Sequence, residues 1–455
     1  MSTAPARSFR HCRFALWGRP QAGRTAELTN LTGAIIVACM GESSENGPGT
    51  PPRPSPPPHW AVGRVTAVGF LSWALDAFDF FLVVLCLTNI ARTLHSSDVE
   101  IAATITLTLA FRPVGAAIFG YLADRYGRRR PMMLNLVFYS LMEVLSGLAP
   151  NYLCFLVLRG LFGIGMGGLW GPDAALTMES APLRLRGILS GVLQEGYIVG
   201  SLLAALAYYL VVPAWGWRCL FYLGGLPALL AVFVRWGVPE SPVWQSGQRL
   251  NLVQAAGTLA HHWKRVLSMI LLMTMMNFSS HGTQDMYPTF LVKFWHVNAM
   301  VKSALTAIAS CGGIVGGILI GCLSDRYGRR RALASSLILA FLVTPLWAFA
   351  PGLGLLALGG FLMQFLVQGA WGVIPAHLTE LSPDSVRGIL PGFAYQCGVC
   401  LASAAAVVES LLARYMPYSV AMASAAGVIL VLAAIVARLG PENHQRLFIP
   451  ARLDT

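Results

Sequence analysis

Polar side chains that could bind a solute or carry a proton gather in one apolar stretch, residues 266–294. Asn277, His281 and Asp285 follow one another at intervals of four residues, so a helix would place all three on one face. The stretch is long enough to cross a bilayer, where polar groups are costly unless they face a protected or wet interior. An amide, an imidazole and a carboxyl on such a face indicate a site for a solute and a proton.

The same stretch contains a proline that should interrupt the helix. Pro288 has no N–H to donate to the carbonyl of Gln284, so we expect the helix to kink or open there and to free that carbonyl. The residues of this stretch that we expect to contact substrate are Asn277, His281, Gln284 and Tyr287.

A pair of acids lies in another apolar segment, residues 65–94. Asp76 and Asp79 are three residues apart and therefore share a helix face. Two carboxylates this close in a low dielectric should not both be charged, which suits a proton carrier. The alternative is a structural pair tied to a nearby arginine. Together with His281 and Asp285, these two acids are the expected proton-coupling residues.

Arg112 lies in the middle of an apolar segment. Its planar guanidinium could grip a substrate carboxylate with two parallel hydrogen bonds, which a lysine could not do. The alternative is an ion pair with Asp76 or Asp79, and both arrangements could hold at different steps of one cycle.

The composition excludes a water-soluble protein. Hydrophobic residues make up 56% of the 455 residues, charged residues only 11%, and the mean hydropathy is +0.62. A soluble protein of this length needs far more charge on its surface. The net charge of +12 comes from basic residues in short loops between apolar spans, which indicates a membrane topology signal and no nucleic-acid partner. The nine cysteines are scattered, and we expect no metal and no cofactor beyond a coupled proton.

Twelve apolar spans follow an N-terminal extension. Their approximate limits are 65–94, 101–122, 132–149, 152–179, 187–211, 217–236, 266–294, 302–323, 332–350, 353–379, 388–413 and 418–438. We therefore expect an all-α membrane protein with six-helix bundles at 61–236 and 266–440, a linker at 237–265 and a tail at 441–455. Residues 1–60 are rich in Arg, Pro, Gly and Ser, and are either a disordered extension or upstream of a true start at Met40.

The arginines and lysines concentrate in alternate loops, those after the even-numbered spans. Because such loops face the cytoplasm, both termini are expected there.

The chain contains an internal repeat. Gly-Tyr-Leu-Ala-Asp-Arg-Tyr-Gly-Arg-Arg-Arg at 120–130 recurs as Gly-Cys-Leu-Ser-Asp-Arg-Tyr-Gly-Arg-Arg-Arg at 321–331, an offset of 201. The pair Gly-Leu-Trp-Gly at 168–171 and Gly-Ala-Trp-Gly at 369–372 keeps that offset. The halves are therefore copies of one six-span unit, related by a pseudo-two-fold axis along the membrane normal. Extending the offset pairs Asp76 with Asn277 across a shared central cavity.

The repeated motif G-x-x-x-D-R-x-G-R-R resembles the signature of the major facilitator superfamily of secondary transporters. Asp124 and Asp325 are placed where they could pair with a nearby arginine or meet a helix N-terminus, and such contacts could lock one face of the transporter. The alternative is that the arginines only anchor the loops at anionic lipid. The expected gating residues are Asp124, Arg125, Arg128, Arg159, Glu179, Arg186, Asp325, Arg326, Arg329, Glu380 and Arg387.

The stretch Asn277-x-x-Ser280-His281-x-Thr283-Gln284-Asp285-x-x-x-Thr289 resembles the signature N-x-x-[S/T]-H-x-[S/T]-Q-D-x-x-x-T of lactate/pyruvate:proton permeases in the sialate:proton symporter subfamily. Residues 73–81 look like the first span of that subfamily. The resemblance implies that Asn277, His281 and Asp285 handle a monocarboxylate and a proton.

These features predict a monomeric inner-membrane symporter that moves a short monocarboxylate anion such as lactate or pyruvate with a proton by alternating access. The alternatives are a symporter for sialic acid or another organic acid, and a membrane sensor that binds an organic acid without moving it. No metal set or nucleophile–base pair indicates an enzyme.

Overall fold

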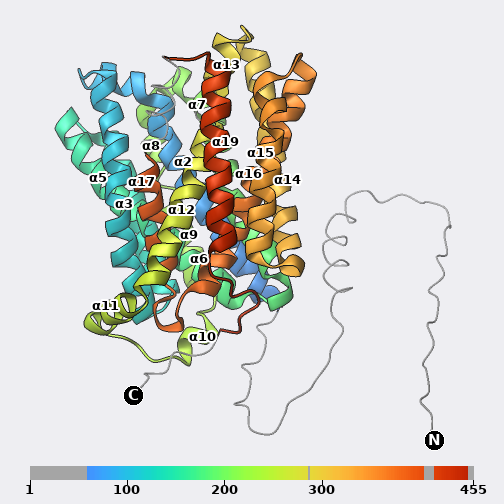
Figure 1. Cartoon of the computed structure of the whole chain (residues 1–455). Coiled ribbons are helices and arrows are strands. Elements are labelled where there is room, and N and C mark those ends of the chain that lie inside the picture. Colours follow the sequence, from blue (N-terminus) through green and yellow to red (C-terminus); the bar gives the residue numbers. More distant parts are fainter. Residues whose placement is uncertain (1–58, 285–286, 404–414, 449–455) are drawn as a thin grey trace, which may run out of the picture. The chain divides into compact units, whose positions relative to one another are not determined.

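A computed structural model describes residues 59–284, 287–403 and 415–448, and within these ranges all regular secondary structure is helical. The expectations for residues 1–58, for Asp285 and for the end of the tail lie outside the described residues. Figure 1 shows long helices running side by side, with the short helices α10 (Pro242–Gln245) and α11 (Leu252–His261) at one end.

The first six spans are formed by eight α-helices. They are α2 (His59–Thr93), α3 (Asp98–Tyr126), α4 (Arg129–Leu148), α5 (Tyr152–Gly167), α6 (Trp170–Ser180), α7 (Arg186–Trp215), α8 (Trp217–Leu223) and α9 (Pro227–Gly237), with the short 3-10 helix η1 (Leu183–Leu185) before α7. The start of α3 has a complete capping box, because the Glu100 N–H donates to the Ser97 hydroxyl while the Ser97 N–H donates to the Glu100 carboxylate.

The second six spans repeat this plan. They comprise α12 (Trp263–Gln284), α13 (Tyr287–Lys293), α14 (Ala299–Tyr327), α15 (Arg329–Phe349), α16 (Leu353–Leu381), α17 (Leu390–Ala402) and α19 (Tyr418–Leu439), with η2 (Asp384–Val386) before α17. Ten described helical segments are long and apolar enough to cross a membrane. The seventh expected span contains α12 and α13, and the first half of the eleventh contains α17, while residues 285–286 and 404–413 of these spans lie outside the described residues.

Two expected continuous spans are interrupted. The fourth breaks at Gly168 between α5 and α6, where a side chain would overlap the ring of Phe119. The sixth breaks between α8 and α9, where Gly224 faces the side chains of Glu143 and Asp79. Both breaks bring backbone close to a neighbouring helix, which glycine permits.

The helix packing follows the internal repeat. Within the bundles, α2 packs on α7 as α12 packs on α17, and α3 packs on α5 as α14 packs on α16. Between the bundles, α7 packs on α14 as α3 packs on α17. The two six-helix units of the described chain are therefore related as the offset of 201 predicts.

The bundles are in close contact on the side where α3 and α14 end, which we call the arginine-rich side. At this side of the α7–α14 contact, a methyl group on Gly191 would overlap the Gly317 carbonyl. At the equivalent α3–α17 contact, a methyl group on Gly120 would lie 2.5 Å from the Ile389 Cα. The structure thus has its arginine-rich side closed.

Candidate functional site

Aromatic rings from both bundles meet around Tyr395, which lies on α17. The centroid of the Tyr395 ring is 4.8 Å from that of Trp170, 5.6 Å from that of Trp371 and 6.0 Å from that of Trp73. Trp170 and Trp371 are repeat equivalents, so Tyr395 lies where the two halves of the protein face each other. We call these four residues the aromatic cluster.

Arg112 lies beside the aromatic cluster, in the middle of α3. Its side chain is buried, with 4% of the residue exposed, and its guanidinium faces the Tyr395 hydroxyl and the carboxyl of Asp76. No ion pair to Arg112 forms among the described residues, where its Nε and Nη2 atoms have no hydrogen-bond partner. The guanidinium interacts with the Tyr395 side chain, but its two open nitrogen atoms are costly to bury and could bind an anion.

Asp76 and Asp79 lie fully buried on α2. None of their carboxylate oxygens has a hydrogen-bond partner among the described residues. Arg112 faces Asp76 and Arg159 faces Asp79, but neither arginine binds the carboxyl group that it faces. The geometry therefore does not show a structural pair tied to an arginine.

The acids outnumber the arginines in this part of the N-terminal bundle. Glu143 pairs with Arg159 at 2.7 Å, and Asp173 is buried near Asp76. Among the described residues, only two arginines, Arg112 and Arg159, lie near four carboxyl groups. These belong to Asp76, Asp79, Glu143 and Asp173. The four carboxyl groups are therefore only partly compensated by arginine, which is costly for buried charges.

A cavity of about 180 Å³ opens between the bundles. Phe81 and Tyr197 line it from the N-terminal bundle, while Gln284, Tyr287 and Gln364 line it from the C-terminal bundle. The Tyr197 ring is 5.6 Å from that of Phe81 and 5.7 Å from that of Trp73. These contacts connect the cavity to the aromatic cluster.

Only two of the four aromatic residues within 73–81 lie near the cavity and the aromatic cluster. Trp73 and Phe81 face this region, whereas Phe78 and Phe80 pack within the core of the N-terminal bundle.

The seventh-span residues reach the interior in different ways. The Gln284 amide donates to the Gln364 side chain at 2.8 Å, and both line the cavity. The Tyr287 hydroxyl donates to the Leu356 carbonyl, and its ring stacks on Trp347, so only part of its surface faces the cavity. Asn277 is buried and donates to the Met273 carbonyl one turn earlier on its own helix. His281 is half-buried on α12.

On the arginine-rich side, Asp124 joins the two bundles. Its carboxylate accepts hydrogen bonds from the N–H groups of Gly388 and Ile389, at 2.7 and 3.0 Å, just before α17. Arg128 binds Asp124 at 2.7 Å and Glu179 at 3.0 Å, and Arg387 reaches the same Glu179 at 3.2 Å from the other bundle. We call this the first gate.

The repeat builds a second gate from the equivalent residues. Asp325 accepts a hydrogen bond from the Gly187 N–H at 2.9 Å, at the start of α7. Arg329 pairs with Asp325 at 2.9 Å and with Glu380 at 3.0 Å, and Arg186 reaches Glu380 at 3.1 Å across the bundle boundary. In the first gate, Arg387 is the repeat equivalent of Arg186. Burial lowers the pKa of Arg387 to about 10, so its guanidinium remains charged near neutral pH.

Three expected gating residues lie elsewhere. Asp124 pairs with Arg128 and not with Arg125, because the chain turns at Gly127, whose φ is 101°, and this turn between α3 and α4 brings Arg128 back to Asp124. Arg125 contacts the Tyr121 hydroxyl at 3.4 Å, and Arg326 is exposed. Arg159 binds Glu143 inside the N-terminal bundle and takes no part in either gate.

Sequence reasoning missed several residues that complete the gates and the cluster. Trp244 and Gln445 differ by the repeat offset, and their side-chain N–H groups donate to the carbonyls of Asp124 and Asp325, respectively. The repeated tryptophans 170 and 371 carried a signal, because they lie in the duplicated Gly-x-Trp-Gly motif. Tyr395 carried none, since its repeat equivalent is Gln194.

Comparison with known proteins agrees with this architecture. Residues 67–269 match the sugar (and other) transporter family, and residues 270–452 match the major facilitator superfamily. The sialic acid transporter NanX of Escherichia coli is 30% identical over 361 residues, which cover 78% of this chain and 88% of NanX. A carboxylic acid transporter protein homolog of Saccharomyces cerevisiae is 26% identical, and the match covers 79% of this chain but only 62% of the yeast protein.

Solved structures share the fold. The proton:xylose symporter XylE superposes with a TM-score of 0.68 at 19% identity, covering 85% of this chain and 98% of XylE. The human organic anion transporter MFSD10 superposes with a TM-score of 0.67 at 15% identity, covering 84% of this chain and 100% of that one. With its twelve-span plan, its repeat and these relatives, the chain belongs to the major facilitator superfamily and is a multi-pass membrane transporter of the organic-acid and sugar type, not an enzyme.

Proposed function

We propose that this transporter is a symporter that moves a short monocarboxylate, such as lactate or pyruvate, together with a proton by alternating access. The observation that carries the proposal is Arg112, a buried guanidinium at the junction of the two bundles with two nitrogen atoms unpartnered among the described residues. A substrate carboxylate would supply the missing acceptor oxygens in a bidentate arrangement.

The surroundings of Arg112 suit a small organic acid. The rings of the aromatic cluster can pack against the carbon atoms of the substrate, while Arg112 fixes its charged end. The adjoining cavity of about 180 Å³ is smaller than the roughly 300–1,000 Å³ typical of pockets for drug-sized ligands. Relatives named for carboxylic acid, sialic acid and muconate transport support an acid as the substrate class.

The proton would bind among the buried acids of the N-terminal bundle. Asp76 faces Arg112, so a substrate carboxylate that engages Arg112 removes the compensation which Asp76 receives from it. Asp76 or its neighbour Asp79 then binds a proton more tightly, which couples the two ligands reciprocally. His281 and Asp285 are the rival carriers in the seventh span.

In this proposal the protein works as a monomer in the cell inner membrane, with the arginine-rich side and both termini in the cytoplasm. The closed gates on that side and the cavity between the bundles then correspond to a state in which substrate is reached from outside the cell.

The test is uptake of radiolabelled acids into proteoliposomes, with and without an inward proton gradient. We expect lactate or pyruvate to accumulate only with the gradient, and unlabelled short monocarboxylates to compete. Accumulation that ignores the gradient would exclude proton symport. Accumulation of labelled sialic acid but not of lactate would select the alternative substrate, and binding without uptake would select a sensor.

A further inference from the structure

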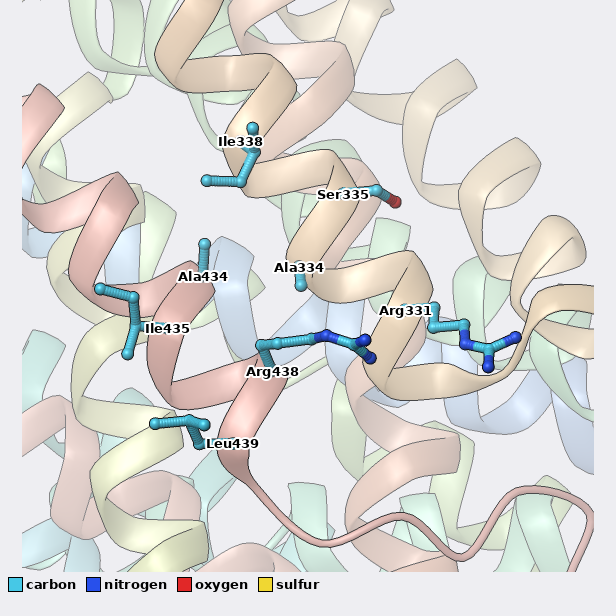
Figure 2. Close-up of a pocket in the computed structure, with 8 residues that line it drawn as sticks. All are labelled: Arg331, Ala334, Ser335, Ile338, Ala434, Ile435, Arg438 and Leu439. Carbon is cyan, nitrogen blue, oxygen red and sulfur yellow. The ribbon is translucent and has the colours of Figure 1, made fainter.

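The outer surface of the C-terminal bundle carries two grooves that meet at one arginine. The first, of about 570 Å³, lies between α15 and α19, and the side chains that line it include Ala334, Ile338, Ala434 and Ile435 (Figure 2). The second, of about 380 Å³, lies on the other flank of α15 against α14 and α16. Arg331 lines both grooves.

The three consecutive arginines at the start of α15 lie in different surroundings. Arg329 is buried in the second gate. Arg330 points to the segment after α19, where its guanidinium donates to the Gly440 carbonyl at 2.9 Å. Arg331 is exposed and has no ion pair or hydrogen bond within the described chain. Neither the gates nor the tail accounts for Arg331.

A second arginine faces Arg331. Arg438, in the last turn of α19, extends toward α15 at the level of Arg331 (Figure 2), and it too has no ion pair in the described part of the chain. Two like charges that share the end of one groove repel each other unless an anion lies between them. Tyr327 lines the second groove near the same end and is 64% exposed, as suits an aromatic side chain at a membrane–water interface.

We propose that these two grooves form a binding site for an anionic phospholipid. The phosphate lies between Arg331 and Arg438, and one acyl chain follows each flank of α15. Ile338 lines the first groove and Leu339 the second, so adjacent residues on one ridge separate the two chains. Basic pockets between membrane helices are known to hold anionic headgroups, and two apolar grooves beside one phosphate site fit a two-chain lipid better than a free anion.

The test uses the purified full-length protein in detergent and does not depend on which solute is transported. The protein is incubated with equal amounts of phosphatidylglycerol and phosphatidylcholine and then washed, and the retained lipid is measured by mass spectrometry. We expect wild type to retain about tenfold more phosphatidylglycerol, and Arg331→Gln/Arg438→Gln to lose this preference. Arg64→Gln/Arg130→Gln removes the same charge from positions that line neither groove, and should behave as wild type.

A further variant and a competitor separate the lipid from other anions. Ser335→Trp keeps both arginines but obstructs the two grooves, which Ser335 also shares, and should reduce phosphatidylglycerol retention several-fold. Excess inorganic phosphate should not displace the lipid from wild type. Equal retention of both lipids by wild type, full retention by both groove variants, or displacement by phosphate would overturn the proposal.

Discussion

Arg112 combines burial, a position at the bundle junction and two guanidinium nitrogens without a partner in the described chain. Arg112→Lys keeps the charge but removes the planar fork, so we expect the loss of one charge-assisted hydrogen bond to substrate, about 1.5–3 kcal/mol. The apparent KM for the acid should rise about 10- to 100-fold. Uptake assays on proteoliposomes measure this, with exposed Arg92→Lys as the matched control. An unchanged KM would remove Arg112 from the site.

Asp76 and Asp79 differ in what faces them, and this difference separates their expected roles. Asp76→Asn should abolish accumulation driven by a proton gradient while substrate exchange, which needs no net proton movement, continues. Asp79→Asn should have the smaller effect, because Asp79 faces the Glu143–Arg159 pair and not Arg112. The two assays are counterflow and gradient-driven uptake in the same vesicles. If both variants still concentrate substrate, the proton travels through the seventh span, where Asp285→Asn becomes the next variant.

Residue types and spacing predicted much of this site but not its contacts. The buried acids and Arg112 stood out because charge is rare in apolar segments. The pairing of Asp124 with Arg128 depends on the turn at Gly127 between α3 and α4, which the spacing of the charged residues alone does not show. The position of Tyr395 among three tryptophans depends on how two bundles pack, and no local pattern in one chain encodes that.

At the scale of elements, apolar length and the repeat offset predicted the spans and their equivalences. The sequence did not predict the helix breaks at Gly168 and between α8 and α9, because glycine and proline are also frequent within continuous membrane helices. The segment after α19 was expected to be only a tail. Instead its described part packs over the second gate, with Asn443 donating to the Glu380 carbonyl and Arg446 bound to Asp384 at 2.6 Å.

Phe448, in the segment after α19, contacts both bundles. Its ring lies 3.9 Å from the guanidinium carbon of Arg186 and 3.9 Å from that of Arg387, and these arginines belong to different bundles. Cation–π contacts contribute about 0.5–2 kcal/mol each. Phe448→Ala should therefore shift the protein several-fold toward a state open on the arginine-rich side, and Phe448→Tyr should restore closure.

The shift can be measured by electron–electron resonance between spin labels at Tyr126→Cys and Tyr327→Cys, in a background without other reactive cysteines. These positions are exposed and equivalent under the repeat, one in each bundle. An unchanged distance distribution in Phe448→Ala would show that the segment covers the gates without holding them.

In the whole transporter, both gates resist the same motion, a rigid-body separation of the two bundles on the arginine-rich side. The first gate joins α3 to the start of α17, the second joins α14 to the start of α7, and both must break together. Asp124→Asn and Asp325→Asn each weaken charge-assisted bonds to backbone N–H groups across the boundary. Each should shift the opening equilibrium about tenfold, with slower turnover and nearly unchanged substrate affinity.

The double variant tests whether the gates act on the same motion. Because free-energy changes at separate sites add when both act on one equilibrium, Asp124→Asn/Asp325→Asn should shift opening about a hundredfold, roughly the product of the single effects. Distance distributions between labels at positions 126 and 327 give the open fraction of each variant. A double variant no more open than either single one would mean that one gate alone controls closure, and a large loss of substrate affinity would place Asp124 or Asp325 in the binding site.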